Sequence, residues 1–146
     1  YKVLHVQDLD FQSNCWTLRS CLTTVKSWSD AHPEHVPIAI LVEAKDTKDV
    51  DLPGFEQVQP IEIRGAELDA LDAEIREIFP AEQLITPDDV RGTRATLAEA
   101  IRLDGWPTLG EVRGKVIFLL DNGGRIKADY TAGHPSLRGR VMFTSA

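Results

Sequence analysis

Hydrophobic residues along the chain form two kinds of segment, short continuous apolar runs and stretches with apolar residues at helical spacing. The run IAILVEA at 38–44 is typical of a strand that is buried on both faces. Apolar residues at Leu18, Cys21/Leu22, Val25 and Trp28 instead follow the period of one helix face. The pattern predicts four strands, at 3–6, 38–44, 115–122 and 140–146, and three helices, at about 16–29, 66–79 and 93–103.

Several residues indicate where these helices begin and end. Ser13 or Asn14 could cap the first helix, and Pro80 should end the second. The segment TPDDV at 86–90 is typical of a helix start, with a Thr cap, Pro at the first position and acidic residues in the first turn. The polar segment 45–60 contains several helix and strand breakers, and we expect it to be a loop.

The order of the elements predicts an α/β fold with parallel strands. Strand, helix and strand of these lengths form a βαβ unit with a right-handed crossover. The chain starts on one predicted core strand and ends on another, which would leave unpaired strand edges. We therefore expect the interior part of a larger assembly of strands, such as a barrel; the alternative is a compact four-stranded α/β domain with its own edges.

Charge and composition exclude some classes of function. The chain has 146 residues, enough for one domain with a hydrophobic core, and its 16 basic and 23 acidic residues give a net charge of −7. This balance argues against a nucleic-acid partner, and no basic cluster marks a patch for anionic lipids. We find no apolar run long enough for a transmembrane segment and no signal-peptide pattern, although a leader could have been removed.

In parallel α/β proteins, reactive groups gather where the strands end. By this rule His5, Glu43 and Lys45 are the main candidates. Glu43 directly follows an apolar strand, so it must face a polar cavity, a cation or a partner, because burial of a bare carboxylate is costly. Lys45 lies on the same side as Glu43 by strand alternation and could simply pair with it. A histidine, a carboxylate and a cation at one rim are compatible with phosphodiester chemistry and with several other reactions.

Other polar residues at strand ends favour structural interpretations. Asp8 and Asp10 share a face and could form a metal pair, but solvated loop residues are the simpler interpretation. Asp46 is a further candidate at the end of the second strand, and Asp121-Asn122 with Gly123-Gly124 is typical of a turn. A zinc site is not expected from the loop histidines, which are His32, His35 and His134.

The two cysteines, Cys15 and Cys21, leave two alternatives open. Within one helix they would be about 9 Å apart along the axis, too far for a disulfide. If Cys15 lies before the helix, the chain could fold back and join them. Otherwise they are two small buried apolar residues.

Long segments of the chain resemble the bacterial calcium-dependent, phosphatidylinositol-specific phospholipase C family. The resemblance is carried by VLHVQDLDFQSNC, by CLTTVKSWSDAHPEHVPIAILVEAKD and by WPTLGEVRGKVIFLLDN, and it is weakest over 47–85. It implies a (β/α)8 barrel of the TIM type, secretion from the cell, and calcium as the cofactor of the intact protein. It also implies a phosphoinositide lipid at a membrane surface as the partner.

The resemblance implies roles for individual residues. His5 matches the second of the family's two catalytic histidines, a general acid/base, and Glu43 matches the carboxylate near the calcium, as a ligand or base. Lys45 is a possible contact to phosphate or inositol, and the secreted context favours a Cys15–Cys21 disulfide.

The family's first catalytic histidine and most calcium ligands have no counterpart in this sequence. We therefore interpret residues 1–146 as a single partial barrel domain, about strands three to six, that lacks the N-terminal and C-terminal strands. We expect this fragment by itself to bind calcium weakly, to lack substantial phospholipase activity, and to associate with itself or with the missing parts. The alternatives are a glycerophosphodiester phosphodiesterase-like barrel and a non-catalytic binding or structural barrel.

Overall fold

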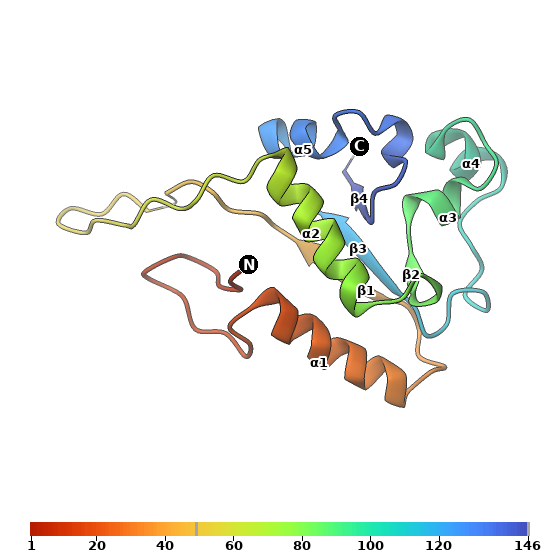
Figure 1. Cartoon of the computed structure of the whole chain (residues 1–146), viewed down its shortest axis with the longest axis horizontal. Helices are drawn as coiled ribbons and strands as arrows, with labels where there is room; N and C mark the ends of the chain where they lie inside the picture. The colour runs from red at the N-terminus through yellow and green to blue at the C-terminus, as the bar shows by residue number, and fades with distance from the viewer. Residues whose placement is uncertain (49, 146) are drawn as a thin grey trace.

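A parallel four-stranded sheet forms the centre of the computed structural model, which describes residues 1–48 and 50–145 (Figure 1). The elements are α1 (Leu18–Ala31), β1 (Ile38–Val42), α2 (Gly65–Ile78), β2 (Leu84–Ile85), α3 (Pro87–Arg91), α4 (Leu97–Leu103), β3 (Val116–Leu120), α5 (Gly124–Thr131) and β4 (Met142–Thr144). Single 3-10 turns occur at Ala81–Gln83 and Pro135–Leu137. The predicted parallel sheet is therefore present.

Strand β3 is the centre of the sheet. It pairs with β1 over its whole length, from Ile38 opposite Val116 to Val42 opposite Leu120. Its other edge is shared, because β2 pairs with its first two residues and β4 pairs with its last three. All three pairings are parallel, so the carboxyl ends of β1 and β3 lie at the same edge of the sheet.

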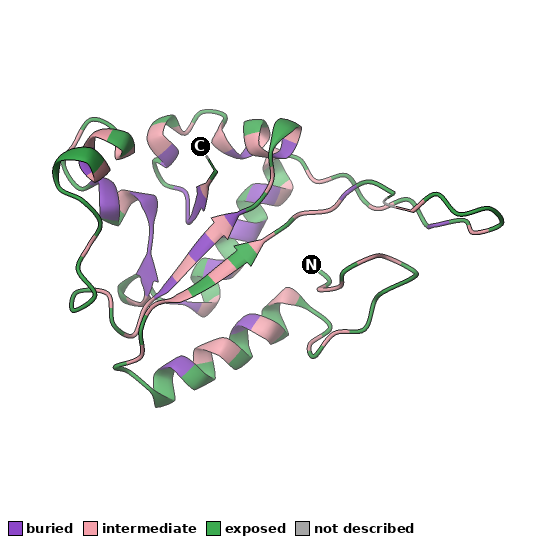
Figure 2. Cartoon of the chain, turned by 180° about the vertical axis from the view of Figure 1, so that it is seen from behind, coloured by how far each residue is buried: buried purple, intermediate pink, exposed green. Residues whose placement is uncertain are grey.

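The core lies between this sheet and the helices α1, α2 and α5. Alternate residues of β3, which are Val116, Phe118 and Leu120, are buried under the helices. In β1 the opposite face remains open, and the side chain of Leu41 is 63% exposed (Figure 2). Leu68, Leu71 and Ile75 of α2 and Tyr130 of α5 belong to the same buried cluster.

Capping residues mark where the helices α1 and α3 begin. Thr86 caps α3 with Pro87 at the first position, as the sequence predicts, and its side chain accepts from the amide of Asp89. The cap predicted for α1 is wrong, because Thr17 rather than Ser13 or Asn14 fills that position. Thr17 and Ser20 form a reciprocal capping box, which satisfies two backbone donors at the helix start.

The strand predicted at 3–6 is wrong. This segment belongs to an irregular loop, residues 1–16, which we call the N-terminal loop. Val6 and Asp10 exchange two backbone hydrogen bonds of 2.9 and 2.8 Å across a turn in which Asp8 has φ of 66°. The backbone groups of this segment are therefore used within the loop, and the predicted βαβ unit has no first strand in the described residues.

Three further differences concern short elements. The helix predicted at 93–103 begins only at Leu97, where Thr96 caps it. The Gly123-Gly124 turn leads directly into α5, a helix that the sequence pattern did not predict. Strand β2 has only two residues, too few to give an alternating pattern.

Candidate functional site

The three residues singled out in the sequence lie together beyond the carboxyl end of β1. The Lys45 ammonium lies 3.7 Å from a carboxylate oxygen of Glu43, as expected from their alternation. The same Nζ donates to the backbone carbonyl of His5 at 3.2 Å, although the two residues are 40 positions apart. Lys45 thus connects the strand end to the N-terminal loop through the backbone of His5, and we call His5, Glu43 and Lys45 the His5 cluster.

The His5 imidazole has a carboxylate partner that the sequence did not predict. Its Nδ1 lies 2.9 Å from Oδ2 of Asp10, and the His5 side chain is 72% exposed. An ionised carboxylate can only accept a hydrogen bond, so the proton resides on Nδ1 and Nε2 is the basic nitrogen. This arrangement can accept or donate a proton at Nε2.

Next to this cluster, hydrogen bonds connect the residues that follow β3 to those at the end of β1. The amide of Asp121 donates to the carbonyl of Val42 at 2.8 Å, which extends the ladder by one step. The Asn122 side chain accepts from the amide of Ala44 at 2.8 Å and donates to its carbonyl at 2.9 Å. Extending the register places Glu43 and Asp121 as the next cross-strand pair on the open face of the sheet.

A second set of contacts fixes the chain just after Lys45. The buried carboxylate of Asp46 accepts from the amide of Ile63 at 2.9 Å and from the Arg125 guanidinium, which also donates to the Ile63 carbonyl at 2.7 Å. Burial raises the pKa of Asp46, but these hydrogen bonds outweigh it and hold the pKa below its usual value. The sequence gives no signal for Arg125, because only the fold brings it to Asp46.

Residues 50–62, which we call the arm, extend beyond this anchored base. The arm runs beside the N-terminal loop, and both project from the side of the sheet where β1 and β3 end (Figures 1 and 2). Gln57 donates to the Gln7 carbonyl at 2.9 Å, and the amide of Val58 donates to the Asp8 carboxylate at 2.7 Å. Asp8 therefore has a structural role in connecting the two segments.

The other predicted candidates lie apart from the cluster. His35 Nε2 contacts the Ser29 hydroxyl at 2.7 Å, and the His32 ring stacks on Trp28, both beside the start of β1. His134 contacts the carbonyl of Arg138 at 2.7 Å. Among the described residues, no group of three or more His, Cys, Asp and Glu side chains is close enough to hold a metal ion.

The two cysteines form a disulfide. Helix α1 begins at Leu18, so Cys15 precedes it and folds back to Cys21, with the two Cα atoms 5.3 Å apart. The bond closes the end of the N-terminal loop onto the first turns of α1. Of the alternatives that the spacing left open, the structure has the folded-back arrangement.

Comparisons with known proteins identify the family. The sequence matches the family model described as "Phosphoinositide phospholipase C, Ca2+-dependent" over residues 1–146. No curated protein matches the chain. None of the helices within 1–48 and 50–145 is long and apolar enough to cross a membrane.

Solved structures show the same fold. A calcium-dependent phosphoinositol-specific phospholipase C from the Gram-negative bacterium Pseudomonas sp is 23% identical, with a TM-score of 0.63 over 88% of this chain and 41% of that one. A Ca2+-dependent phosphatidylinositol-specific phospholipase C from Streptomyces antibioticus is 27% identical, with a TM-score of 0.63 over 91% of this chain and 43% of that one. The chain thus spans about two fifths of the length of these structures.

These matches agree with the fold described above. The predicted fold class, a parallel-stranded part of a (β/α)8 barrel, is confirmed. The resemblance that the sequence carries in its first 46 residues and around β3 extends over the whole chain. This chain belongs to the calcium-dependent phosphoinositide phospholipase C family.

Proposed function

We propose that this chain contributes catalytic residues to a phospholipase C that cleaves phosphatidylinositol into diacylglycerol and an inositol phosphate. The observation that carries the proposal is the cluster of His5, Glu43 and Lys45 at the carboxyl edge of the sheet. Active sites of barrel enzymes lie at this edge. The names of the family and of the two solved structures supply the substrate class.

His5 acts as the general acid/base in this proposal. The inositol 2-hydroxyl attacks phosphorus, the bond from phosphorus to the diacylglycerol oxygen breaks, and a proton moves from the attacking to the leaving oxygen. His5 Nε2 either accepts this proton from the attacking oxygen or donates it to the leaving oxygen, while Asp10 holds the ring in place through Nδ1. Lys45 is the contact for phosphate or inositol, because its ammonium lies between the His5 backbone and Glu43.

Calcium is the cofactor named for the family, and Glu43 is the residue that we propose as one of its ligands. Calcium takes six to eight oxygen ligands. The described residues gather too few carboxylates around Glu43 to supply that number. Residues 1–48 and 50–145 therefore do not complete a calcium site, and we expect the chain to bind calcium weakly and to lack substantial activity by itself.

Secretion belongs to the same proposal. The Cys15–Cys21 disulfide supports it, because such bonds persist in oxidising compartments outside the cytosol. Phosphoinositide lipid at a membrane surface is the proposed partner, and association of the open sheet with itself or with further barrel strands is expected.

The test is release of water-soluble inositol phosphate from phosphatidylinositol vesicles by the full-length protein that carries these residues, with calcium and with EGTA. His5→Asn should lower kcat by about 10²- to 10⁴-fold, whereas His32→Asn, at the opposite edge of the sheet, should not. Equal activity of both variants would refute the role of His5. Cleavage of glycerophosphodiesters in place of phosphatidylinositol, or no cleavage of either, would refute the proposed function.

A further inference from the structure

The Asn122 side chain is hydrogen-bonded to the backbone segment that carries Glu43 and Lys45. Its Oδ1 accepts from the Ala44 amide at 2.8 Å, and its Nδ2 donates to the Ala44 carbonyl at 2.9 Å. Ala44 is the residue between these two members of the His5 cluster. A single side chain therefore holds both polar backbone groups at the centre of this segment.

These two bonds continue the sheet at the point where its backbone ladder ends. The last cross-strand pair of β1 and β3 is Val42 with Leu120. The Asp121 amide adds one more bond, to the Val42 carbonyl, and Asn122 then makes the next contact with its side chain. The backbone of Asn122 has little freedom of its own, because it lies between the end of β3 and Gly123, which caps α5.

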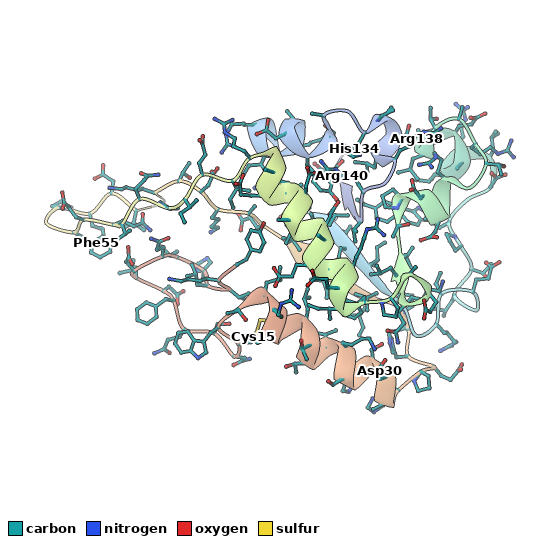
Figure 3. The ribbon with its side chains drawn as sticks, viewed as in Figure 1. Cys15, Asp30, Phe55, His134, Arg138 and Arg140 are labelled. Carbon is teal, nitrogen blue, oxygen red and sulfur yellow. A yellow bond between two sulfur atoms is a disulfide. The ribbon has the colours of Figure 1, made fainter. Side chains whose placement is uncertain are left out.

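The side chains of Glu43 and Lys45 depend on this backbone for their positions. Their exposed fractions are 57% and 29%, so packing restrains them little, and Glu43 least. Farther along, the chain continues into the arm, whose far end near Phe55 projects away from the sheet (Figure 3). A shift of the peptide groups of Ala44 would therefore move both side chains together.

The carboxamide of Asn122 matches both backbone groups of Ala44, because it has an acceptor oxygen and a donor nitrogen. An ionised aspartate at this position could only accept, so it would bind the Ala44 amide but place a negative oxygen beside the Ala44 carbonyl. Alanine would remove both bonds and leave two backbone groups of the half-buried Ala44 without this partner. Both substitutions should therefore free the segment from the end of β3, without a change in its own side chains.

We propose that Asn122 is a positioning residue for the cleavage reaction, which holds Glu43 and Lys45 in register with the end of β3 through the backbone of Ala44. This inference rests on the proposed function, because it takes Lys45 as the contact to phosphate or inositol and Glu43 as a calcium ligand. Asn122 itself contacts neither the substrate nor the metal in this role. Its loss should impair the reaction by displacing the two residues that do.

The first measurement is the release of inositol phosphate from phosphatidylinositol vesicles, with calcium, by the full-length protein that carries these residues. Asn122→Ala and Asn122→Asp should each lower kcat/KM by about 10- to 100-fold, since a misplacement of about 1 Å has effects of up to this size. The control is Tyr130→Phe, which also removes a side-chain hydrogen bond, of 2.8 Å to Asp72, but in the buried core. This variant should keep its kcat/KM at a temperature at which circular dichroism shows all variants folded.

The second measurement, hydrogen exchange of the Ala44 amide by NMR without lipid or calcium, is independent of catalysis. In Asn122→Ala this amide should exchange about tenfold faster or more, while the amides of β3 exchange as before. Three results would each overturn the proposal: unchanged exchange of Ala44, faster exchange with full kcat/KM, or an equal loss of kcat/KM in Tyr130→Phe. If the unchanged protein cleaves no phosphatidylinositol, the proposed function fails, whereas the exchange rate still decides whether Asn122 holds this segment.

Discussion

Replacement of Arg125 by methionine should destabilise the protein through the arm base. The guanidinium donates to the Asp46 carboxylate and to the Ile63 carbonyl, and the exposed fractions of the Arg125 and Asp46 side chains are 34% and 4%. Removal of one partner of a fully buried ion pair costs about 3–5 kcal/mol. Water can reach Arg125, and Asp46 keeps the Ile63 amide. We therefore expect the free energy of unfolding to fall by about 2–3 kcal/mol.

The assay is urea unfolding of a double-mutant cycle with Asp46→Asn and Arg125→Met. The two changes should be non-additive by about 1–2 kcal/mol, because each removes the same ion pair. Arg138→Met is the control, since Arg138 is exposed and donates to the Ala95 carbonyl at 3.2 Å. Its cost should stay within about 0.5 kcal/mol. Additive effects of the pair, or equal costs for Arg125→Met and Arg138→Met, would refute the argument.

The same site predicts a pH dependence. The pKa of Asp46 is lowered in the folded protein, so the unfolded chain takes up a proton more readily. The stability that Asp46 contributes is present above its ordinary pKa of 3.8 and is lost as the pH falls toward the lower folded value. Urea midpoints of the unchanged protein and of Asp46→Asn should converge on acidification below about pH 4. A constant difference down to the lowest pH that retains the fold would contradict this.

Two further substitutions test the core and a close backbone contact. Tyr130→Phe removes the hydroxyl that donates to the buried Asp72 at 2.8 Å and should lower the free energy of unfolding by about 1–3 kcal/mol in urea; a loss below about 0.5 kcal/mol would contradict it. Gly114→Ala should cost more than Gly54→Ala by calorimetry: both glycines have positive φ, but a Cβ at Gly114 would lie 2.4 Å from the Pro33 carbonyl oxygen, whereas one at Gly54 meets nothing within 4 Å. Equal shifts in Tm would refute the close approach.

The sequence predicted the parts of the fold that local patterns determine. The runs that became β1 and β3 are continuous apolar segments, which are typical of strands in a parallel sheet. The expected burial of 38–44 on both faces is wrong, because one face of β1 is open in these residues and Leu41 is exposed. Pro80 and the Thr86 cap mark helix ends by their own chemistry. The prediction of a strand at 3–6 was wrong because a short apolar run has the same sequence pattern in a strand and in a loop that is closed by its own hydrogen bonds.

For the candidate site, alternation along the chain was predictable and contacts across the fold were not. Glu43 and Lys45 were expected on one side, and the structure places them 3.7 Å apart. The contact of Lys45 with the His5 carbonyl depends on the path of the N-terminal loop. The hydrogen bond between His5 and Asp10 depends on a turn, and no residue pattern predicted the geometry of that turn. The roles of these residues in catalysis remain predictions that the activity assay tests.

Alternation also explains how this site is held in place. In residues 43–46, Glu43 and Lys45 take part in the cluster, whereas Ala44 and Asp46 are anchored to the segment after β3 by Asn122 and Arg125. Each candidate functional residue is thus next to a fixed one, and little freedom remains for the backbone between them. Arg125 fixes both the base of the arm and the segment that carries Lys45. Loss of Arg125 should therefore loosen the arm and the proposed catalytic cluster together.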